Sequence, residues 1–387
     1  MKLLLYDMGA YTQHDIMDTL EQMGVFFKNI VYKLVNPSAK DAYFEKRVNE
    51  LLLQEQYDAV FSVNYFPVLA DICYEKQIPY LSWSYDSPLN IEKIEETLGY
   101  ETNYVFFFDR VECEKYWRKG YENVYHLPLA VNTARLDKLE VTAKEHKKYS
   151  ADISMVGQLY DTTLPVFMAP LEEYDKGYLT VVIEAQMRLY GCYFLPDVLT
   201  EELVDRMNAR YEALGQKNIK LNREGIVVST AKHITHMERM LLLDVLSEQY
   251  QVHLYGPDKP EGLAKVSWRG SAGYFDEMPY VFKLNKINLN VSLKCIQSGI
   301  PLRALDIMGS GGFLLSNYQP ELAESFVDGE EVVMYTSLED AVAKCAYYLE
   351  HEEERLQIAK RGYEKVCREF GYESRLQAML QVAGLLG

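Results

Sequence analysis

Short apolar runs alternate with amphipathic segments through the first third of the chain. The apolar runs predict strands at residues 2–6, 25–32, 59–63, 80–84 and 105–108, and the amphipathic segments predict helices at 15–23, 41–54 and 69–76. Strands that are apolar throughout and alternate with helices are typical of a parallel sheet covered on both faces. The pattern therefore predicts a doubly wound α/β domain over residues 1–137.

A second alternating series predicts a second doubly wound domain over residues 150–370, with strands near 153–157, 251–256, 265–270, 287–291, 313–316 and 331–335. Between the two domains, the charged stretch 138–149 is expected to be a loop-like linker. Residues 162–225 show helical periodicity without a clear strand and are too long for an ordinary connection, so they are expected to form a helical insertion. The amphipathic segment 371–387 is expected to be a helix that can pack back on the first domain.

Two such domains facing a cleft can hold two substrates, because ligands bind at the carboxyl ends of parallel strands. The formal net charge of -17 argues against binding to nucleic acid or to an anionic membrane surface. A phosphate-bearing ligand would therefore need a local group of basic residues. No run of about 18 apolar residues predicts a transmembrane helix, so the protein is expected in the cytoplasm. The six cysteines have no metal-binding spacing, and neither a metal nor a cofactor is expected.

The window 294–317 of the second domain carries the most informative chemistry. Pro301 stands where a helix is expected to begin, so unpaired backbone amides near its start are suited to a diphosphate. Arg303 adds a positive charge in the first turn, and Asp306 can accept ribose hydroxyl groups. Alternatively, Arg303 and Asp306 pair with each other on a helix surface. The amides belong to the segment Ser298, Gly299 and Ile300.

A second basic group, Lys232, His233 and Arg239, surrounds the expected start of a helix at 237–246. Cations are unfavourable at a helix start unless an anion lies between them, which suggests a further donor contact. Solvated positions, or a metal site at the two histidines of residues 233 and 236, are the alternatives. Tyr255 and Arg269 lie at the ends of two expected strands, beside loops suited to a nucleobase or simply to ordinary turns.

Three strand ends of the first domain carry polar residues that are expected to face an acceptor: Gly9, Asn64 and Tyr85. Asp86 follows Tyr85 directly and is the candidate general base for an acceptor hydroxyl. Asp-Ser-Pro is also an ordinary turn and helix-cap sequence, which gives Asp86 a purely structural alternative. His14 is the second candidate base. No Asp-x-Asp triplet is placed for a metal–diphosphate site, so metal-independent transfer is expected.

Several of these motifs resemble those of the CgeB-like (spore maturation protein) glycosyltransferases, relatives of the group-1 transferases. The motifs are Ser-Gly-Ile-Pro-Leu-Arg at 298–303, Asp-Ile-Met-Gly-Ser-Gly-Gly-Phe-Leu-Leu at 306–315, Lys-His-Ile-Thr-His at 232–236, and Trp-Ser-Tyr-Asp-Ser-Pro at 83–88. The resemblance implies a GT-B fold of two Rossmann-like domains and a nucleotide-sugar donor. In group-1 relatives two glutamates eight residues apart contact the donor. Here the second corresponds to Asp306 and the first to Ser298, while Glu321 matches a later acid.

The sequence thus predicts a transferase that moves a sugar from a nucleotide-diphosphate sugar to a hydroxyl acceptor, either a glycan or a protein. An epimerase of the same fold would convert the donor without any acceptor. A non-catalytic nucleotide-sugar-binding subunit would bind the donor and neither transfer nor hydrolyse it.

Overall fold

A computed structural model describes residues 1–160 and 163–386. Thr162, where the helical insertion was expected to begin, and Gly387, the end of the expected terminal segment, lie outside the described residues. The chain divides into two compact units. The first unit consists of Met1–Arg135, Ser298–Leu305 and Lys365–Gly387. The second unit consists of Leu136–Gln297 and Asp306–Glu364. Within the described part of the chain, every helix is too short or too polar to cross a membrane.

The first unit is built on a parallel sheet of six strands. The strands are β1 (Lys2–Asp7), β2 (Phe26–Val31), β3 (Ala59–Val63), β4 (Tyr80–Ser84), β5 (Asn103–Phe107) and β6 (Val124–His126), in the order β2-β1-β3-β4-β5-β6. All neighbours pair in parallel. The residues of β3 and β4 are buried throughout, as their largely apolar character predicted. The predicted doubly wound fold is confirmed.

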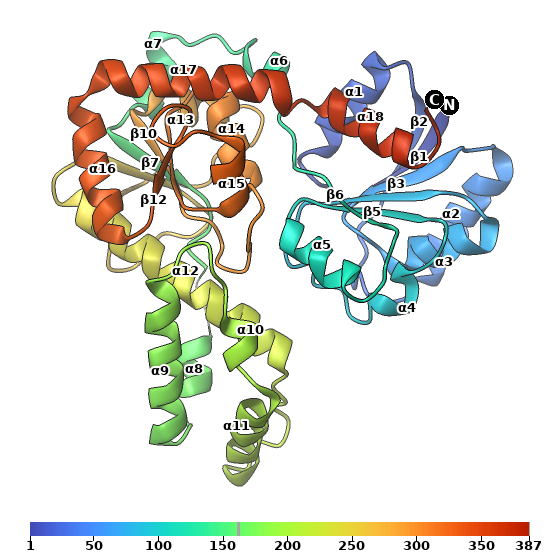
Figure 1. The fold of residues 1–387 in the computed structure, drawn as a ribbon, viewed down its shortest axis with the longest axis horizontal. Helices are drawn as coiled ribbons and strands as arrows, with labels where there is room; N and C mark the ends of the chain where they lie inside the picture. The colour runs from blue at the N-terminus through green and yellow to red at the C-terminus, as the bar shows by residue number, and fades with distance from the viewer. Residues whose placement is uncertain (161–162, 387) are drawn as a thin grey trace. The chain divides into compact units, whose positions relative to one another are not determined.

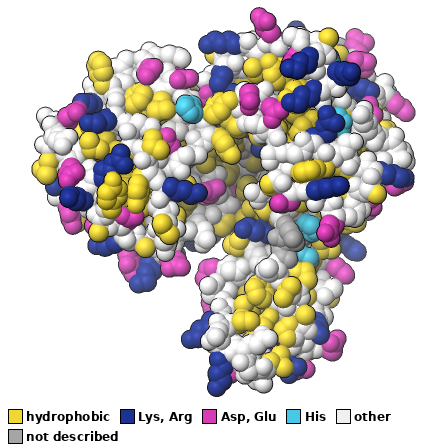
Figure 2. Space-filling view, turned by 180° about the vertical axis from the view of Figure 1, so that it is seen from behind, with side chains coloured by type: hydrophobic (Ala, Val, Ile, Leu, Met, Phe, Trp, Pro, Cys, Tyr) yellow, Lys and Arg dark blue, Asp and Glu magenta, His cyan; other side chains and the backbone are white. Residues whose placement is uncertain are grey.

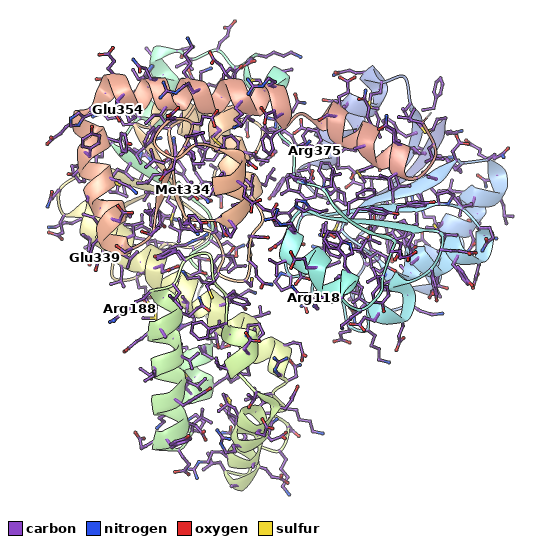
Figure 3. All side chains as sticks on the ribbon, viewed as in Figure 1. Arg118, Arg188, Met334, Glu339, Glu354 and Arg375 are labelled. Atoms are coloured by element: carbon purple, nitrogen blue, oxygen red, sulfur yellow. The ribbon has the colours of Figure 1, made fainter. Side chains whose placement is uncertain are left out.

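Helices cover both faces of this sheet (Figure 1). They are α1 (Gln13–Gln22), α2 (Ala42–Gln54), α3 (Pro67–Lys76), α4 (Glu95–Leu98), α5 (Arg110–Trp117) and α18 (Tyr372–Val382). The short helix α6 (Thr133–Leu136) follows β6 along the chain. Helix α18 lies beside α1, where Leu376 and Leu380 face Leu3 and Phe61 of the sheet. Arg375, labelled in Figure 3, joins α18 to the loop after β6 by donating to the Pro128 carbonyl at 3.1 Å.

The second unit is also built on a parallel sheet of six strands. They are β7 (Ile153–Val156), β8 (Val252–Tyr255), β9 (Ser267–Trp268), β10 (Ile287–Asn290), β11 (Leu314–Asn317) and β12 (Val333–Tyr335), in the order β12-β11-β10-β7-β8-β9. The flanking helices are α13 (Met278–Leu284), α14 (Leu302–Gly309), α15 (Pro320–Ser325), α16 (Leu338–Glu350) and α17 (Glu352–Glu369). The order places β7 and β10 at the centre of the sheet, which confirms the second predicted doubly wound fold.

Between β7 and β8 the chain forms an all-helical arm with a hydrophobic core of its own (Figure 1). It contains α8 (Leu164–Met168), α9 (Glu173–Met187), α10 (Leu195–Val198), α11 (Glu201–Ala213) and the first part of α12 (Arg223–Ser247). Arg188, at the end of α9, lies near Glu339 at the start of α16 (Figure 3). The pKa of Glu339 is lowered, chiefly by its own backbone amide and the Ser337 hydroxyl, and further by the charge of Arg188.

Two local predictions were wrong. The stretch 138–149 is not a loop throughout, because α7 (Ala143–Tyr149) begins at a capping box of Thr142 and Glu145, which pairs the first amides of the helix. The helix expected at 237–246 begins instead at residue 223, capped by the Asn222 side chain. The segment between these positions contains no proline and no glycine after Gly225, so nothing interrupts the helix.

Charged residues of both signs are interspersed on one face of the molecule (Figure 2). On the face drawn in Figure 2, Lys and Arg side chains alternate with Asp and Glu, and hydrophobic side chains gather on the helical arm.

Candidate functional site

In the first unit, Asn64 organises the loop that carries the candidate base. Asn64 follows β3 with a φ of 64°, a left-handed conformation that asparagine tolerates better than most residues. Its side-chain oxygen accepts from the Tyr85 amide at 2.8 Å, and its side-chain nitrogen donates to the Asp86 carboxylate at 2.7 Å. Asp86 is exposed, so a carboxylate held in one position faces solvent at the carboxyl edge of the sheet.

The loop after β1 contains the remaining acceptor-side candidates. The Gly9 amide donates to the Asp7 carboxylate at 2.7 Å, and the Asn29 side chain donates to its second oxygen at 3.2 Å. His14 is exposed on α1, one residue after the helix begins. The structure therefore joins Asn64, Tyr85 and Asp86 by hydrogen bonds. Gly9 lies in the β1–α1 connection, and His14 lies in the first turn of α1.

The segment Ser298–Leu305 belongs to the first unit, where it packs against the end of β5. The buried Asp109 carboxylate accepts from the Ser298 hydroxyl at 2.8 Å and its amide at 3.2 Å, and also from the Ser87 hydroxyl at 2.9 Å. At Gly299, an added Cβ would lie 2.7 Å from the Phe108 ring. The sequence did not reveal that Asp109 and Ser298 would be partners.

Two acidic residues that follow this segment along the chain, Asp306 and Glu321, are buried. Asp306 is 6% exposed and accepts from the Tyr274 hydroxyl at 3.0 Å, and Glu321 is 3% exposed in the first turn of α15. Ile300 is fully buried, and Arg303 is half-buried at the second residue of α14. Donor contacts by Ser298, Gly299, Ile300, Arg303, Asp306 and Glu321 stay predictions.

In the second unit, the Arg239 guanidinium lies at the carboxyl ends of two central strands. It donates to the Gln158 carbonyl after β7 and, from Nε at 3.2 Å and from Nη2, to the Val291 carbonyl after β10. Its plane also lies 4.8 Å from the Tyr160 ring centroid. Arg239 comes from the middle of α12, so a side chain singled out from the sequence does reach the strand edge, although from a different part of its helix than expected.

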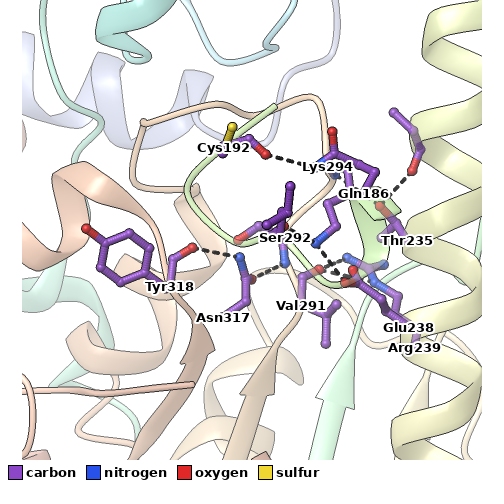
Figure 4. A network of polar contacts seen from close by, with 12 residues as sticks. Gln186, Cys192, Thr235, Glu238, Arg239, Val291, Ser292, Lys294, Asn317 and Tyr318 are labelled. Carbon is purple, nitrogen blue, oxygen red and sulfur yellow. Dashed lines mark hydrogen bonds and ion pairs between the residues drawn. The ribbon is translucent and has the colours of Figure 1, made fainter. Parts of the chain in front are cut away.

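A buried ion pair that the sequence analysis missed lies beside Arg239 (Figure 4). The Lys294 ammonium is 2.7 Å from a Glu238 carboxylate oxygen, and the two side chains are 8% and 2% exposed. Burial raises the pKa of Glu238, while Lys294 acts in the opposite direction. Arg239 and Lys294 carry two positive charges and Glu238 carries one negative charge, so the net charge of this group is +1. The signal for this pair was a lysine following Val-Ser-Leu, directly after an apolar strand.

A pocket of about 490 Å³ opens at the carboxyl ends of β8 and β9. Its walls include Tyr255, Trp268, Arg269, Lys148 and Glu277. Burial raises the pKa of Tyr255 to about 12 against the opposing charge of Arg269. Hydrogen bonds from Lys148 and the backbone of residue 273 lower the pKa of Glu277 to about 2. The pocket thus combines an aromatic surface, a fixed cation and a fixed carboxylate, which suits a planar, polar ring.

The remaining basic candidates lie in the interior of α12, not at a helix start. Lys232 is exposed, and His236 forms a hydrogen bond with the Leu159 carbonyl at 2.9 Å. Burial, together with the charge of His236, lowers the pKa of His233. The expectation that these side chains surround the start of a helix is wrong, and the dipole argument for an anion between them no longer applies. Within the described residues, no group of three or more His, Cys, Asp or Glu is placed to hold a metal ion.

The two parallel-sheet units define the GT-B fold. A glycosyltransferase from Rickettsia africae is similar over 99% of this chain and 97% of its own, with 9% identity and a TM-score of 0.55. The Anabaena protein HepE in complex with UDP and glucose is similar over all of both chains, with 9% identity and a TM-score of 0.54. Sucrose-phosphate synthase from Thermosynechococcus elongatus is similar over 98% of each chain, with 11% identity and a TM-score of 0.57.

The family comparison is more local. Residues 238–381 match the model of the glycosyl transferase-like family. The matched region includes Lys294, Arg239 and the strand ends from β8 to β12. No curated protein sequence matches the chain significantly.

Proposed function

We propose that this protein is a glycosyltransferase that moves a sugar from a nucleotide-diphosphate sugar to a hydroxyl group of a glycan or protein. One observation carries the proposal: the carboxyl edge of the second sheet combines an aromatic, polar pocket with the buried Arg239 guanidinium. The match to the glycosyl transferase-like family supports the same reaction. Within the group-1 type we assign the chain to the CgeB-like family, on the motifs described from its sequence.

In this proposal the pocket at Tyr255, Trp268 and Arg269 binds the nucleobase, and Arg239 lies on the side of the diphosphate. The Arg239 guanidinium supplies positive potential there, and in this proposal no metal ion is required to stabilise the leaving diphosphate. HepE was solved with UDP and glucose, which makes UDP-glucose the first donor to test.

The first unit supplies the acceptor side of the proposed reaction. Asp86 takes the proton of the acceptor hydroxyl, whose oxygen forms a bond to the anomeric carbon of the sugar. The bond between that carbon and the phosphate oxygen breaks, and its electron pair leaves with the nucleoside diphosphate. Asn64 keeps the Asp86 carboxylate in place through the hydrogen bond at 2.7 Å.

The proposal is tested by a thermal-shift screen of nucleoside diphosphates and their sugar conjugates, followed by product analysis with each donor that binds. A ligand present at 100 times its Kd stabilises the folded protein by about 2.7 kcal/mol. Transfer to an added acceptor supports a glycosyltransferase. Conversion of the donor without acceptor would identify an epimerase, and binding without transfer or hydrolysis would identify a non-catalytic subunit.

Replacing Arg269 with alanine is expected to weaken nucleoside diphosphate binding about tenfold, since a charge-assisted contact to a ligand contributes roughly 1.5–3 kcal/mol. Isothermal titration with UDP measures the change. Arg368→Ala is the matched control, because this arginine is exposed on α17 and pairs only locally with Glu369 at 2.7 Å. Equal affinities for the two variants would show that the pocket does not bind the nucleobase.

A further inference from the structure

The loop Leu189–Tyr193 of the helical arm lies over the carboxyl ends of β10 and β11 (Figure 4). It connects α9 to α10, and the Gln186 side chain donates to its Cys192 carbonyl at 2.8 Å. The Tyr190 ring meets the Tyr335 ring of β12 edge-on, with centroids 5.7 Å apart. The arm projects from the second unit, and one of its loops also covers the carboxyl ends of β10 and β11.

Lys294 holds this loop against the sheet. Its ammonium donates to the Leu189 carbonyl at 3.3 Å, lies 4.0 Å from the Tyr190 ring centroid, and pairs with Glu238 at 2.7 Å. The Lys294 backbone amide donates to the Thr235 hydroxyl at 3.0 Å. A buried charge pair is tolerated only in a well-defined geometry, because each ion loses its hydration. The pair therefore fixes the loop in one position relative to the strand ends.

A small polar cavity of about 20 Å³ lies between the loop and the sheet. Its lining includes Tyr190, Cys192, Ser292, Asn317 and Gln319. The Ser292 amide donates to the Asn317 side-chain oxygen at 2.7 Å, and the Asn317 side chain donates to the Tyr318 carbonyl at 3.2 Å. A cavity of this size holds about one water molecule, and so also one hydroxyl group.

We propose that the loop Leu189–Tyr193 forms a wall of the donor-sugar site that accepts a hydroxyl group and excludes a larger acetamido group, with Lys294 as its positioning residue. The inference rests on the proposed function. The loop lies at the carboxyl ends of the strands, which is where doubly wound folds bind their ligands. It adds a determinant of sugar selectivity that comes from the helical arm and not from the two sheets.

The test compares the affinities of the full-length protein for UDP, UDP-glucose and UDP-N-acetylglucosamine by titration calorimetry. We expect the wild type to bind UDP-glucose at least tenfold more tightly than UDP-N-acetylglucosamine. In Lys294→Met this ratio should fall to threefold or less, while the affinity for UDP changes less than twofold. If Lys294 contributed only to the overall stability of the protein, its replacement would lower the affinity for all three ligands to a similar degree.

Two further variants make the outcome decisive. Lys286→Met is the matched control, because Lys286 forms an ion pair with Asp152 at 2.7 Å at the opposite, amino-terminal edge of the same sheet. Gly191→Ala moves the loop without touching Lys294, since Gly191 has a φ of +71° and a Cβ there would lie 2.6 Å from the Tyr318 ring. It replaces Lys294→Met if that variant does not fold.

The inference is overturned if the ratio of the affinities for UDP-glucose and UDP-N-acetylglucosamine stays at the wild-type value in both Lys294→Met and Gly191→Ala. It is also overturned if the wild type prefers UDP-N-acetylglucosamine. Either result leaves the proposed function intact. A wild type that binds none of the three ligands overturns both. A loss of selectivity in the loop variants, with Lys286→Met unchanged, supports the loop as the wall of the sugar site.

Discussion

The Asp86→Asn variant is expected to transfer sugar about 10²–10⁴-fold more slowly than the wild type, the usual contribution of a general base. Asparagine has nearly the same shape as aspartate and can still accept the hydrogen bond from Asn64, which is 2.7 Å long in the wild type. It cannot take a proton from the acceptor hydroxyl. The rate falls in kcat, measured with saturating donor and acceptor, while the Kd for the nucleotide stays unchanged.

Glu92→Gln is the matched control for this variant. Glu92 is another exposed acid in the connection that follows β4, and its backbone amide donates to the Ser38 hydroxyl at 2.9 Å. Its substitution removes the same charge without touching the Asn64 contact. If Asp86→Asn and Glu92→Gln retain equal kcat values, Asp86 is a turn residue and the base must lie elsewhere.

Arg239→Met should have the second large effect, on stability and on nucleotide binding together. Methionine fills most of the buried volume but leaves the Gln158 and Val291 carbonyls without this donor. Unpaired buried acceptors cost roughly 1–3 kcal/mol each, so we expect a loss of about 2–6 kcal/mol in the free energy of unfolding. Urea denaturation measures this loss, and titration with UDP is expected to show an affinity about 100-fold lower.

Arg239→Lys separates the two roles of this side chain. Lysine keeps the positive charge, but its single ammonium cannot reproduce the forked contact to two carbonyls. We expect stability to fall nearly as far as in the methionine variant while a larger share of the UDP affinity survives. Full UDP affinity in the stably folded part of an Arg239→Met sample would show that Arg239 supports the strand ends and has no part in donor binding.

The fold could be predicted largely because its strands are buried on both faces. A strand such as β3, with all five residues buried, is largely apolar, and that pattern is visible without any knowledge of its neighbours. The boundaries of α12 were harder to predict. Its apolar start at Ile226 resembles a short strand, and only the Asn222 cap and the absence of a break distinguish one long helix.

The candidate site was predicted in part, and the missed residues share a physical reason. Asp86 and Asn64 follow strands directly, so their position at the sheet edge can be inferred from the chain order. Glu238 and Lys294 are separated by 55 intervening residues and meet only because α12 crosses the carboxyl end of β10. Likewise, the hydrogen bonds between Asp109 and Ser298 depend on packing between distant segments, which no local pattern encodes.

The packing of α18 on the first sheet also affects how the protein is made. Residues 1–135 leave the ribosome well before Tyr372, and at about 5–20 residues per second the interval is roughly 10–50 s. During that time the apolar surface that later meets Leu376, Met379 and Leu380 is uncovered. The nascent first sheet therefore exposes this surface to chaperones that bind hydrophobic segments, until translation delivers the helix that covers it.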